Sequence, residues 1–254
     1  MELGLQGRHA LVTGASKGIG RATALALASE GCDLTLVSRT QADLDTVASE
    51  IRASCNVQTH VVALDLAERG AIDRLFAGIQ DLDILVNNAG AIPRGTLEDI
   101  EEDQWREVWE LKVFGYINSC RKAYALMRAR GSGVIINIIG AGGDRVMADY
   151  AAGAGGNASL MALTRALGGG SLRDGIRVVG INPGAIETER LVTLMQSAAE
   201  RKFGDASRWR ELMNPDFPPG QPEHIADMVA FLASDRSGNT TGTIITIDGG
   251  GVNR

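Results

Sequence analysis

The feature that most constrains the fold is a glycine-rich turn near the start of the chain. Residues 9–13 are apolar and predict a strand, and residues 21–30, rich in alanine and leucine, predict a helix. Between them, Gly14, Gly18 and Gly20 follow the spacing Gly-x-x-x-Gly-x-Gly. Glycines permit a tight turn and let backbone N–H groups approach a pyrophosphate, to which the helix N-terminus adds positive potential. The pattern therefore predicts the first strand–turn–helix unit of a dinucleotide-binding domain.

Short strands and helices alternate along most of the remaining sequence. A helical stretch follows at residues 41–53, and aliphatic or β-branched runs predict further strands at 33–37, 57–63, 84–86, 134–138, 177–181 and 242–247. Such alternation indicates β–α–β units, and hence a parallel sheet with helices on both faces. We therefore predict an α/β fold with a doubly wound parallel sheet, the Rossmann fold. Because the 32 glycines are scattered rather than gathered in a linker, residues 1–254 are expected to form a single dinucleotide-binding domain.

Composition and charge exclude several classes of protein. A net charge of −6 argues against a broad nucleic-acid surface. No apolar run reaches the ~18 residues that a membrane span needs, and the N-terminus lacks the charged-then-apolar pattern of an export signal. The cysteines Cys32, Cys55 and Cys120 are odd in number and lack the spacing of metal ligands. This favours reduced thiols in a cytoplasmic protein, with no metal site.

Residues 187–222 interrupt the alternation. The segment is polar, carries Arg201, Lys202, Arg208 and Arg210, and ends in a proline-rich stretch. One interpretation is a substrate lid or a loop insertion, because long insertions in a compact domain often serve that purpose. The other is a pair of surface helices with a proline-rich connector.

The residues after the second predicted strand bear on which nicotinamide dinucleotide binds. A carboxylate about 20 residues beyond the glycine-rich turn would bond both hydroxyls of the adenosine ribose and would repel a 2′-phosphate. Ser38 and Arg39 stand there instead. Arg39 can pair bidentately with a phosphate, and Lys17 adds a second positive charge. We therefore predict NADP(H) rather than NAD(H); the alternative is that Arg39 is a solvated residue at the entry to a helix.

The chain resembles the short-chain dehydrogenase/reductases over roughly residues 6–250. Beyond the glycine-rich turn, the resemblance rests on motifs after the predicted strands, namely Asp65-Leu66, Asn87-Asn88-Ala89-Gly90, and Asn182-Pro183-Gly184 with Thr188. Residues 222–235 and 241–250 also follow the family pattern. In the family these motifs contact adenine, pack against the cofactor and hold the nicotinamide carboxamide. The cofactor-binding residues expected here are Gly14, Ser16, Lys17, Gly18, Ile19, Gly20, Ser38, Arg39, Asp65, Leu66, Asn88, Ala89, Gly90, Asn157, Pro183, Gly184 and Thr188.

The resemblance implies hydride transfer between the nicotinamide and a small carbonyl or alcohol. In the family a tyrosine exchanges the proton, a lysine four residues later lowers the pKa of that tyrosine, a serine orients the substrate oxygen, and an asparagine completes a proton relay. The residues at the serine, tyrosine, lysine and asparagine positions of this chain are Gly140, Gly153, Asn157 and Lys112. All four usual catalytic residues are therefore expected to be replaced.

Three interpretations of this altered site remain open. In the first, catalysis is rebuilt as a Tyr150–Lys112 pair: Tyr150 lies about 4.5 Å of helical rise before the usual tyrosine, and Lys112 supplies the missing cation. In the second, the pocket performs other chemistry, for which Asp144, Arg145 and Asp149 are candidates, although each can be a solvated turn residue. In the third, the protein binds NADP(H) but catalyses little, as a cofactor sensor or partner subunit.

The expected function is that of an NADP(H)-dependent oxidoreductase of the short-chain dehydrogenase/reductase type. It would act on a small carbonyl or alcohol through a non-standard catalytic site. The alternative is an NADP(H)-binding protein with little or no dehydrogenase activity. By analogy with the family, a homo-dimer or homo-tetramer would form through the helices around residues 100–130 and 152–170.

Overall fold

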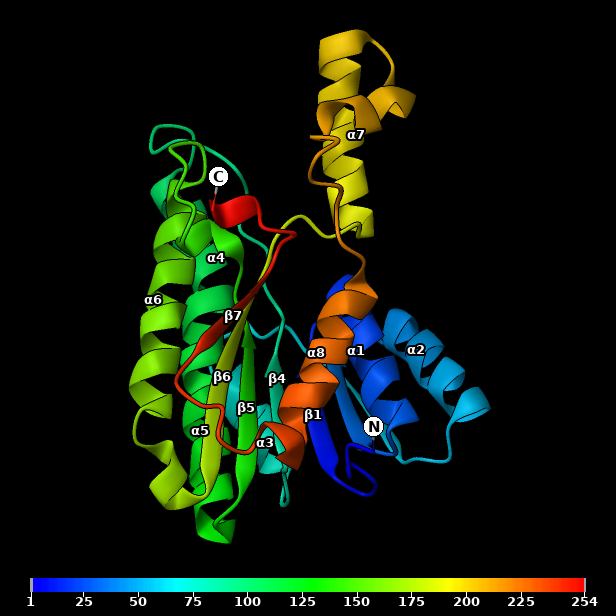
Figure 1. Ribbon diagram of the computed structural model, residues 1–254, viewed down its shortest axis with the longest axis vertical. Coiled ribbons are helices and arrows are strands. Elements are labelled where there is room, and N and C mark those ends of the chain that lie inside the picture. The colour runs from blue at the N-terminus through cyan, green and yellow to red at the C-terminus, as the bar shows by residue number, and fades with distance from the viewer. Residues whose placement is uncertain (1, 254) are drawn as a thin grey trace.

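The chain folds around a seven-stranded sheet in the order β3-β2-β1-β4-β5-β6-β7, with every neighbouring pair parallel (Figure 1). The computed structural model describes residues 2–253. The strands are β1 (His9–Thr13), β2 (Asp33–Ser38), β3 (Thr59–Ala63), β4 (Ile84–Asn87), β5 (Gly133–Ile138), β6 (Ile176–Pro183) and β7 (Ile244–Ile247). Each predicted strand is confirmed, with small differences at the ends.

Helices cover both faces of the sheet. They are α1 (Gly18–Ser29), α2 (Gln41–Ser54), α3 (Ala71–Ala77), α4 (Glu102–Trp109), α5 (Gly115–Arg130), α6 (Ala151–Gly168), α7 (Glu189–Phe203) and α8 (Pro222–Ala233). Figure 1 shows α1, α2 and α8 on one side of the strands, and α4, α5 and α6 on the other. The predicted doubly wound α/β fold is therefore confirmed.

The strands are apolar on both faces because both faces are buried. Successive side chains of a strand point to opposite sides. Accordingly, Val12 of β1 packs in the core under α1 and α8, whereas its neighbour Leu11 packs in the core that contains Met127 of α5. Ile135 and Ile136 of β5 divide between the two cores in the same way. This two-sided burial explains why the strands appear in the sequence as continuous aliphatic runs.

The strand order reverses between β1 and β4. From β1 the chain builds outward through β2 to β3, then returns to place β4 on the other side of β1 and continues to β7. In a sheet of this type the connections on either side of the reversal diverge and leave a crevice at the carboxyl ends of the two strands. The residues that follow Thr13 and Asn87 therefore border the expected ligand site.

Residues 187–222 contain two helical segments. Thr188 caps α7, since its Oγ1 accepts a hydrogen bond from the Leu191 N–H, and a 3₁₀ helix follows at Ala206–Leu212. In Figure 1, α7 stands beyond the carboxyl end of the sheet, above α8. The arrangement corresponds to the predicted pair of surface helices. Its place above the crevice is also compatible with a lid, which stays a prediction.

One irregularity lies between α4 and α5. The chain there forms a π-helical turn at Glu110–Phe114, which contains Lys112. Such turns re-aim side chains and are frequent at functional sites. Among residues 2–253, no helix is long and apolar enough to cross a membrane.

Candidate functional site

The glycine-rich turn closes tightly over the start of α1. Gly14 has a φ of +66°, a left-handed value that favours glycine. A Cβ atom on Gly20 would overlap the carbonyl oxygen of Gly14, so the turn can close only with glycine at that position. No side chain caps the helix at Lys17. The N–H groups of the first turn of α1 are therefore free to receive an anionic group such as a phosphate.

Hydrogen bonds join this turn to the loop after β4. The Thr13 Oγ1 atom accepts bonds from the backbone N–H groups of Asn88 at 2.9 Å and Ala89 at 3.0 Å. In return the Asn88 Nδ2 atom donates to the carbonyl oxygens of Thr13 at 3.0 Å and Gly14 at 3.2 Å. The two loops that border the crevice are thereby fixed to each other.

The end of β2 carries a hydroxyl without a partner. The Ser38 Oγ atom is buried and, within the described part of the chain, makes no hydrogen bond. Buried polar atoms are nearly always satisfied, so this atom points to a ligand. Arg39 beside it is exposed. The side chain of Lys17 is 59% exposed and makes only long ion pairs, at 3.6 Å with Asp43 and 3.9 Å with Glu189. A hydroxyl and two accessible cations fit the phosphorylated ribose of a dinucleotide.

The other predicted cofactor residues lie at the same edge of the sheet. Asp65 and Leu66 follow β3, and Pro183 ends β6. Thr188 returns to the glycine-rich turn, where a Cβ atom on Gly18 would come within 3.0 Å of the Thr188 Cγ2 atom. The predicted cofactor residues thus lie in loops after β1, β2, β3, β4 and β6, at the carboxyl edge of the sheet.

Lys112 is a buried amine beside this crevice. Its side chain is 7% exposed, and Nζ donates to the Ile138 carbonyl oxygen at 2.9 Å and to the Tyr116 hydroxyl at 3.2 Å. The Tyr116 hydroxyl donates to the same carbonyl at 2.9 Å. Burial, with a smaller contribution from the charge of Arg190, lowers the pKa of Lys112 to about 7. The amine can therefore gain and lose a proton near neutral pH.

Tyr150 covers the backbone of Gly153. A Cβ atom built on Gly153 would overlap the Tyr150 ring, so the phenol occupies the space where a side chain at position 153 would begin. The same ring lies against Gly142, whose Cβ would come within 2.8 Å of it. Burial raises the pKa of Tyr150, while the charge of Arg190 and the amide of Asn157 lower it. Near neutral pH the hydroxyl is thus a protonated acid.

Asn157 completes this part of the site. It is 3% exposed, and its Oδ1 atom is buried without a hydrogen-bond partner among residues 2–253. A Cβ atom on Gly140 would lie 3.0 Å from its Nδ2 atom. The structure therefore brings Gly140, Tyr150, Gly153 and Asn157 together, with an unsatisfied acceptor among them.

Known proteins are similar to this chain in sequence and in fold. The family model described as enoyl-(acyl carrier protein) reductase matches residues 14–251. L-xylulose reductase from Mesocricetus auratus is 32% identical over 254 residues, which cover 98% of each chain. The chain belongs to the short-chain dehydrogenase/reductase family. A second relative, 3-oxoacyl-[acyl-carrier-protein] reductase from Staphylococcus aureus, is 33% identical over 96% of this chain and 97% of its own length.

A solved structure extends the likeness to the overall fold. L-sorbose reductase from Gluconobacter frateurii, complexed with NADPH and L-sorbose, has a TM-score of 0.92 and 30% identity over 98% of each chain. Since these relatives are reductases, the chain is an oxidoreductase of this family. That relative binds NADPH, in agreement with the predicted use of a nicotinamide dinucleotide.

The structure leaves the predicted Tyr150–Lys112 pair untested. Within the described residues, the hydrogen bonds of Lys112 go to Tyr116 and Ile138, and none is recorded to Tyr150. Lys112 has three N–H donors, so one remains available. The charge of Arg190 lowers the pKa of both Lys112 and Tyr150.

The other polar candidates have partners within the fold. Asp144 accepts a hydrogen bond from Asn182 at 2.9 Å, and Arg145 donates to the Gly251 carbonyl oxygen at 3.1 Å. Asp149 pairs with Arg94 at 2.9 Å. These contacts account for each residue structurally, without assigning any of them to chemistry.

Two contributors were missed in the sequence, Tyr116 and Arg190. Tyr116 is buried, and its hydroxyl accepts a hydrogen bond from Lys112. Its spacing of four residues from Lys112 was a usable signal, because such residues share a helix face. Arg190 contacts Ile92 across 98 residues of sequence, and no local pattern reveals that contact.

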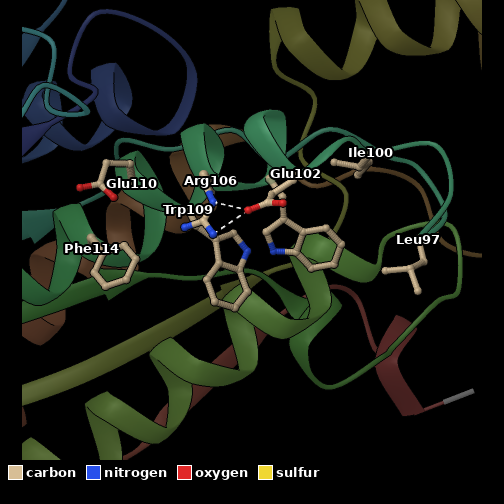
Figure 2. Close-up of a pocket in the computed structure, with 8 residues that line it drawn as sticks. Leu97, Ile100, Glu102, Arg106, Trp109, Glu110 and Phe114 are labelled. Carbon is tan, nitrogen blue, oxygen red and sulfur yellow. Dashed lines mark hydrogen bonds and ion pairs between the residues drawn. The ribbon is translucent and has the colours of Figure 1, made fainter.

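A separate apolar groove lies on α4. Figure 2 shows its lining, which includes Leu97, Ile100, Trp109 and Phe114. Trp105 also lines the groove. Trp109 ties the groove to α6, because its Nε1 atom donates to the Ala152 carbonyl oxygen at 3.0 Å. None of the lining residues belongs to the predicted cofactor set.

Replacing Gly20 by alanine should disrupt the dinucleotide site. The added methyl group would collide with the Gly14 carbonyl oxygen and force the turn open. We expect a loss of stability of about 1–3 kcal/mol and at least about a tenfold weaker NADPH affinity, measured by thermal denaturation and fluorescence titration. Gly78→Ala is the control, since its nearest neighbour would be 3.9 Å away. Unchanged NADPH binding in Gly20→Ala would contradict the role of the tight turn.

Proposed function

We propose that the chain is an NADP(H)-dependent reductase of small carbonyl compounds that works through a rearranged catalytic site. The observation that carries the proposal is the Tyr150 phenol lying over Gly153, beside the dinucleotide crevice. When bound, NADPH would supply a hydride to the carbonyl carbon, a two-electron reduction that leaves the oxygen in need of one proton. The residues of this chain must provide that proton and hold the substrate.

Cofactor preference rests on the charges at the end of β2. Ser38 and Arg39 occupy the place where a carboxylate would select NAD(H), and Lys17 lies across the turn. The ion pairs of Lys17 are long and exposed, so they compete weakly with a phosphate. The 2′-phosphate of NADP(H) would accept from Arg39, Lys17 and the unsatisfied Ser38 hydroxyl.

Tyr150 is the proposed proton donor. Its raised pKa keeps the phenol protonated, and the adjacent Asn157 amide orients the hydroxyl. The Oδ1 atom of Asn157 lacks a partner and is suited to accept a hydrogen bond from a cofactor ribose hydroxyl. Proton donation by a positioned acid contributes about 10²–10⁴ in rate.

Lys112 is the proposed cation of the site. On the predicted register, the family's asparagine is replaced by Lys112 and its lysine by Asn157, so this chain keeps one amine and one amide in exchanged positions. The third N–H of Lys112 is available to the developing negative charge on the substrate oxygen or to Tyr150. The alternative, an NADP(H)-binding protein with little activity, is favoured by the engagement of the other donors with Tyr116 and Ile138.

Two further features belong to this proposal. Residues 187–222 would act as the substrate lid, since α7 stands above the carboxyl ends of the strands (Figure 1). The apolar groove of Leu97, Trp105 and Phe114 falls in the region expected at subunit contacts, which supports a homo-dimer or homo-tetramer.

An NADPH oxidation screen over ketones, quinones and enones tests the function. Tight NADPH binding without consumption of any carbonyl would favour the non-catalytic alternative.

Arg39→Gln should shift the cofactor preference. Loss of one charge-assisted contact of about 1.5–3 kcal/mol predicts a 10–100-fold rise in the NADPH dissociation constant, with little change for NADH. Titration of both nucleotides measures the shift, and Arg128→Gln, an exposed position on α5, is the control. Equal weakening of both nucleotides would rule out a specific 2′-phosphate contact.

Tyr150→Phe should separate catalysis from cofactor binding. We expect kcat to fall by about 10²–10⁴ while NADPH affinity stays unchanged. Tyr124→Phe serves as the matched control, because the Tyr124 hydroxyl binds Asp174 outside the site. Retention of full kcat in Tyr150→Phe would remove this residue from the mechanism.

Lys112 predicts a characteristic pH dependence. The pKa of Lys112 is about 7 in the folded chain, against 10.5 for a free lysine. Between these two pH values the unfolded chain binds more protons, so the stability of the fold rises with pH. Below pH 7 both states are charged, and the folded state bears the full cost of burial. The excess Tm of Lys112→Met over wild type should therefore shrink from pH 7 towards pH 10.

The same variant tests the catalytic role of the amine. If the ammonium form assists reduction, wild-type kcat falls as the pH rises through about 7, and Lys112→Met is slower and lacks that step. Full turnover by Lys112→Met on a genuine substrate would eliminate the Tyr150–Lys112 pair. A pH-independent Tm difference would show instead that Lys112 does not titrate in this range.

A further inference from the structure

We propose that Arg190 binds the carboxylate of an anionic carbonyl substrate, so that the reductase acts on keto acids in preference to neutral ketones. The inference rests on the proposed function and names its substrate class. Arg190 is the second residue of α7, directly after the capped turn that reaches the cofactor crevice. Its Nη2 atom donates to the Ile92 carbonyl oxygen at 2.9 Å.

This contact fixes the guanidinium on the wall of the catalytic space. Ile92 is buried and packs in one cluster with Ala152 and Tyr150. Two residues earlier, Gly90 lies against the aliphatic chain of Lys112, since a Cβ atom there would overlap it. Arg190 is therefore anchored to the loop that runs between the proposed cation and the proposed acid. Its charge acts on the pKa of both.

The charge of Arg190 has no carboxylate to balance it. The two acidic residues that precede Arg190 face other cations: Glu187 pairs with Arg210 at 2.7 Å, and Glu189 lies 3.9 Å from Lys17. Within the part of the chain that the structure describes, no ion pair of Arg190 is recorded. Arg94, whose charge also acts on Tyr150, is by contrast neutralised by Asp149 at 2.9 Å.

An exposed guanidinium with free donors suits a carboxylate. Arginine presents five N–H donors in a rigid fork, and the Ile92 carbonyl occupies only one side of it. The remaining donors can hold a carboxylate bidentately, which fixes orientation as well as charge. A keto acid held this way would place its carbonyl between Lys112 and Tyr150. The other anion available to Arg190 is a phosphate of the cofactor, and the experiment must distinguish the two.

The experiment compares ligands that are matched except for charge. 5-Keto-D-gluconate and L-sorbose share a carbon skeleton and a ketone, and differ by a carboxylate in place of a hydroxymethyl group. Further pairs vary the number of carbons between the two groups. In NADPH oxidation assays, the wild type should show at least about a tenfold higher kcat/KM for the acid of the best pair. Arg190→Gln should lower that value about 10–100-fold, chiefly through KM, as expected for one lost charge-assisted contact.

Controls separate the substrate from the cofactor. Arg190→Gln should change kcat/KM for the neutral ketone, and the NADPH dissociation constant, by less than about threefold. Arg201 is an exposed residue on the same helix, and Arg201→Gln should leave kcat/KM for the acid and the NADPH dissociation constant unchanged. Equal use of acid and neutral ketone by the wild type overturns the inference. So does a loss of NADPH affinity in Arg190→Gln as large as the loss for the acid, because Arg190 would then serve the cofactor.

A binding measurement distinguishes failure of this inference from failure of the proposed function. The wild type with NADP⁺ bound is titrated with D-gluconate and with sorbitol, followed by tryptophan fluorescence. The anion site is supported if gluconate binds saturably, sorbitol binds more weakly, and the Arg190→Gln variant no longer binds gluconate. This holds even when no carbonyl is reduced. Equal binding of the two overturns the anion site, whether or not NADPH is consumed. Absence of NADPH oxidation with every carbonyl overturns the proposed function alone.

Discussion

The hydrogen bonds of Thr13 hold the functional edge of the sheet together. Reversal of the strand order beside β1 forces the loops after β1 and β4 apart and would leave them independent. The Thr13 hydroxyl joins them by accepting from Asn88 and Ala89, and Asn88 returns two bonds to the glycine-rich turn. The position of Gly90, and with it the wall against which Lys112 packs, follows from this connection.

Burial of Lys112 is the second constraint on the site. An ammonium group transferred out of water without partners is costly, so a buried lysine either finds acceptors or loses its proton. Lys112 has two hydrogen-bond acceptors, the Ile138 carbonyl oxygen and the Tyr116 hydroxyl. Its pKa nevertheless falls to about 7, so the amine also loses its proton readily. The π-helical turn directs the residue inwards. The fold therefore buries an amine whose charged form is disfavoured by that burial, and such perturbed groups cluster at functional sites.

Sequence patterns predicted the features that backbone geometry and burial determine. The strands were recognisable because both faces of the sheet are buried, and the dinucleotide turn because Gly14 and Gly20 are required by the chain path itself. The contacts of Arg190 with Ile92 and of Lys112 with Ile138 were not predictable, since they join residues far apart in the chain. The placement of Tyr150 was only partly predictable. Its spacing suggested a shifted tyrosine, but only the fold shows its ring lying over Gly153.

The charge of Arg190 links substrate binding to the protonation of Lys112. In the free protein this charge opposes the ammonium form and contributes to the lowered pKa of Lys112. A carboxylate bound to Arg190 would cancel that repulsion, so the pKa of Lys112 would rise. The amine would then take up a proton as the substrate arrives, when the substrate oxygen is about to acquire negative charge. A neutral ketone would leave Arg190 uncompensated and Lys112 more often deprotonated. Anion recognition and readiness for reduction would therefore be coupled in one electrostatic arrangement.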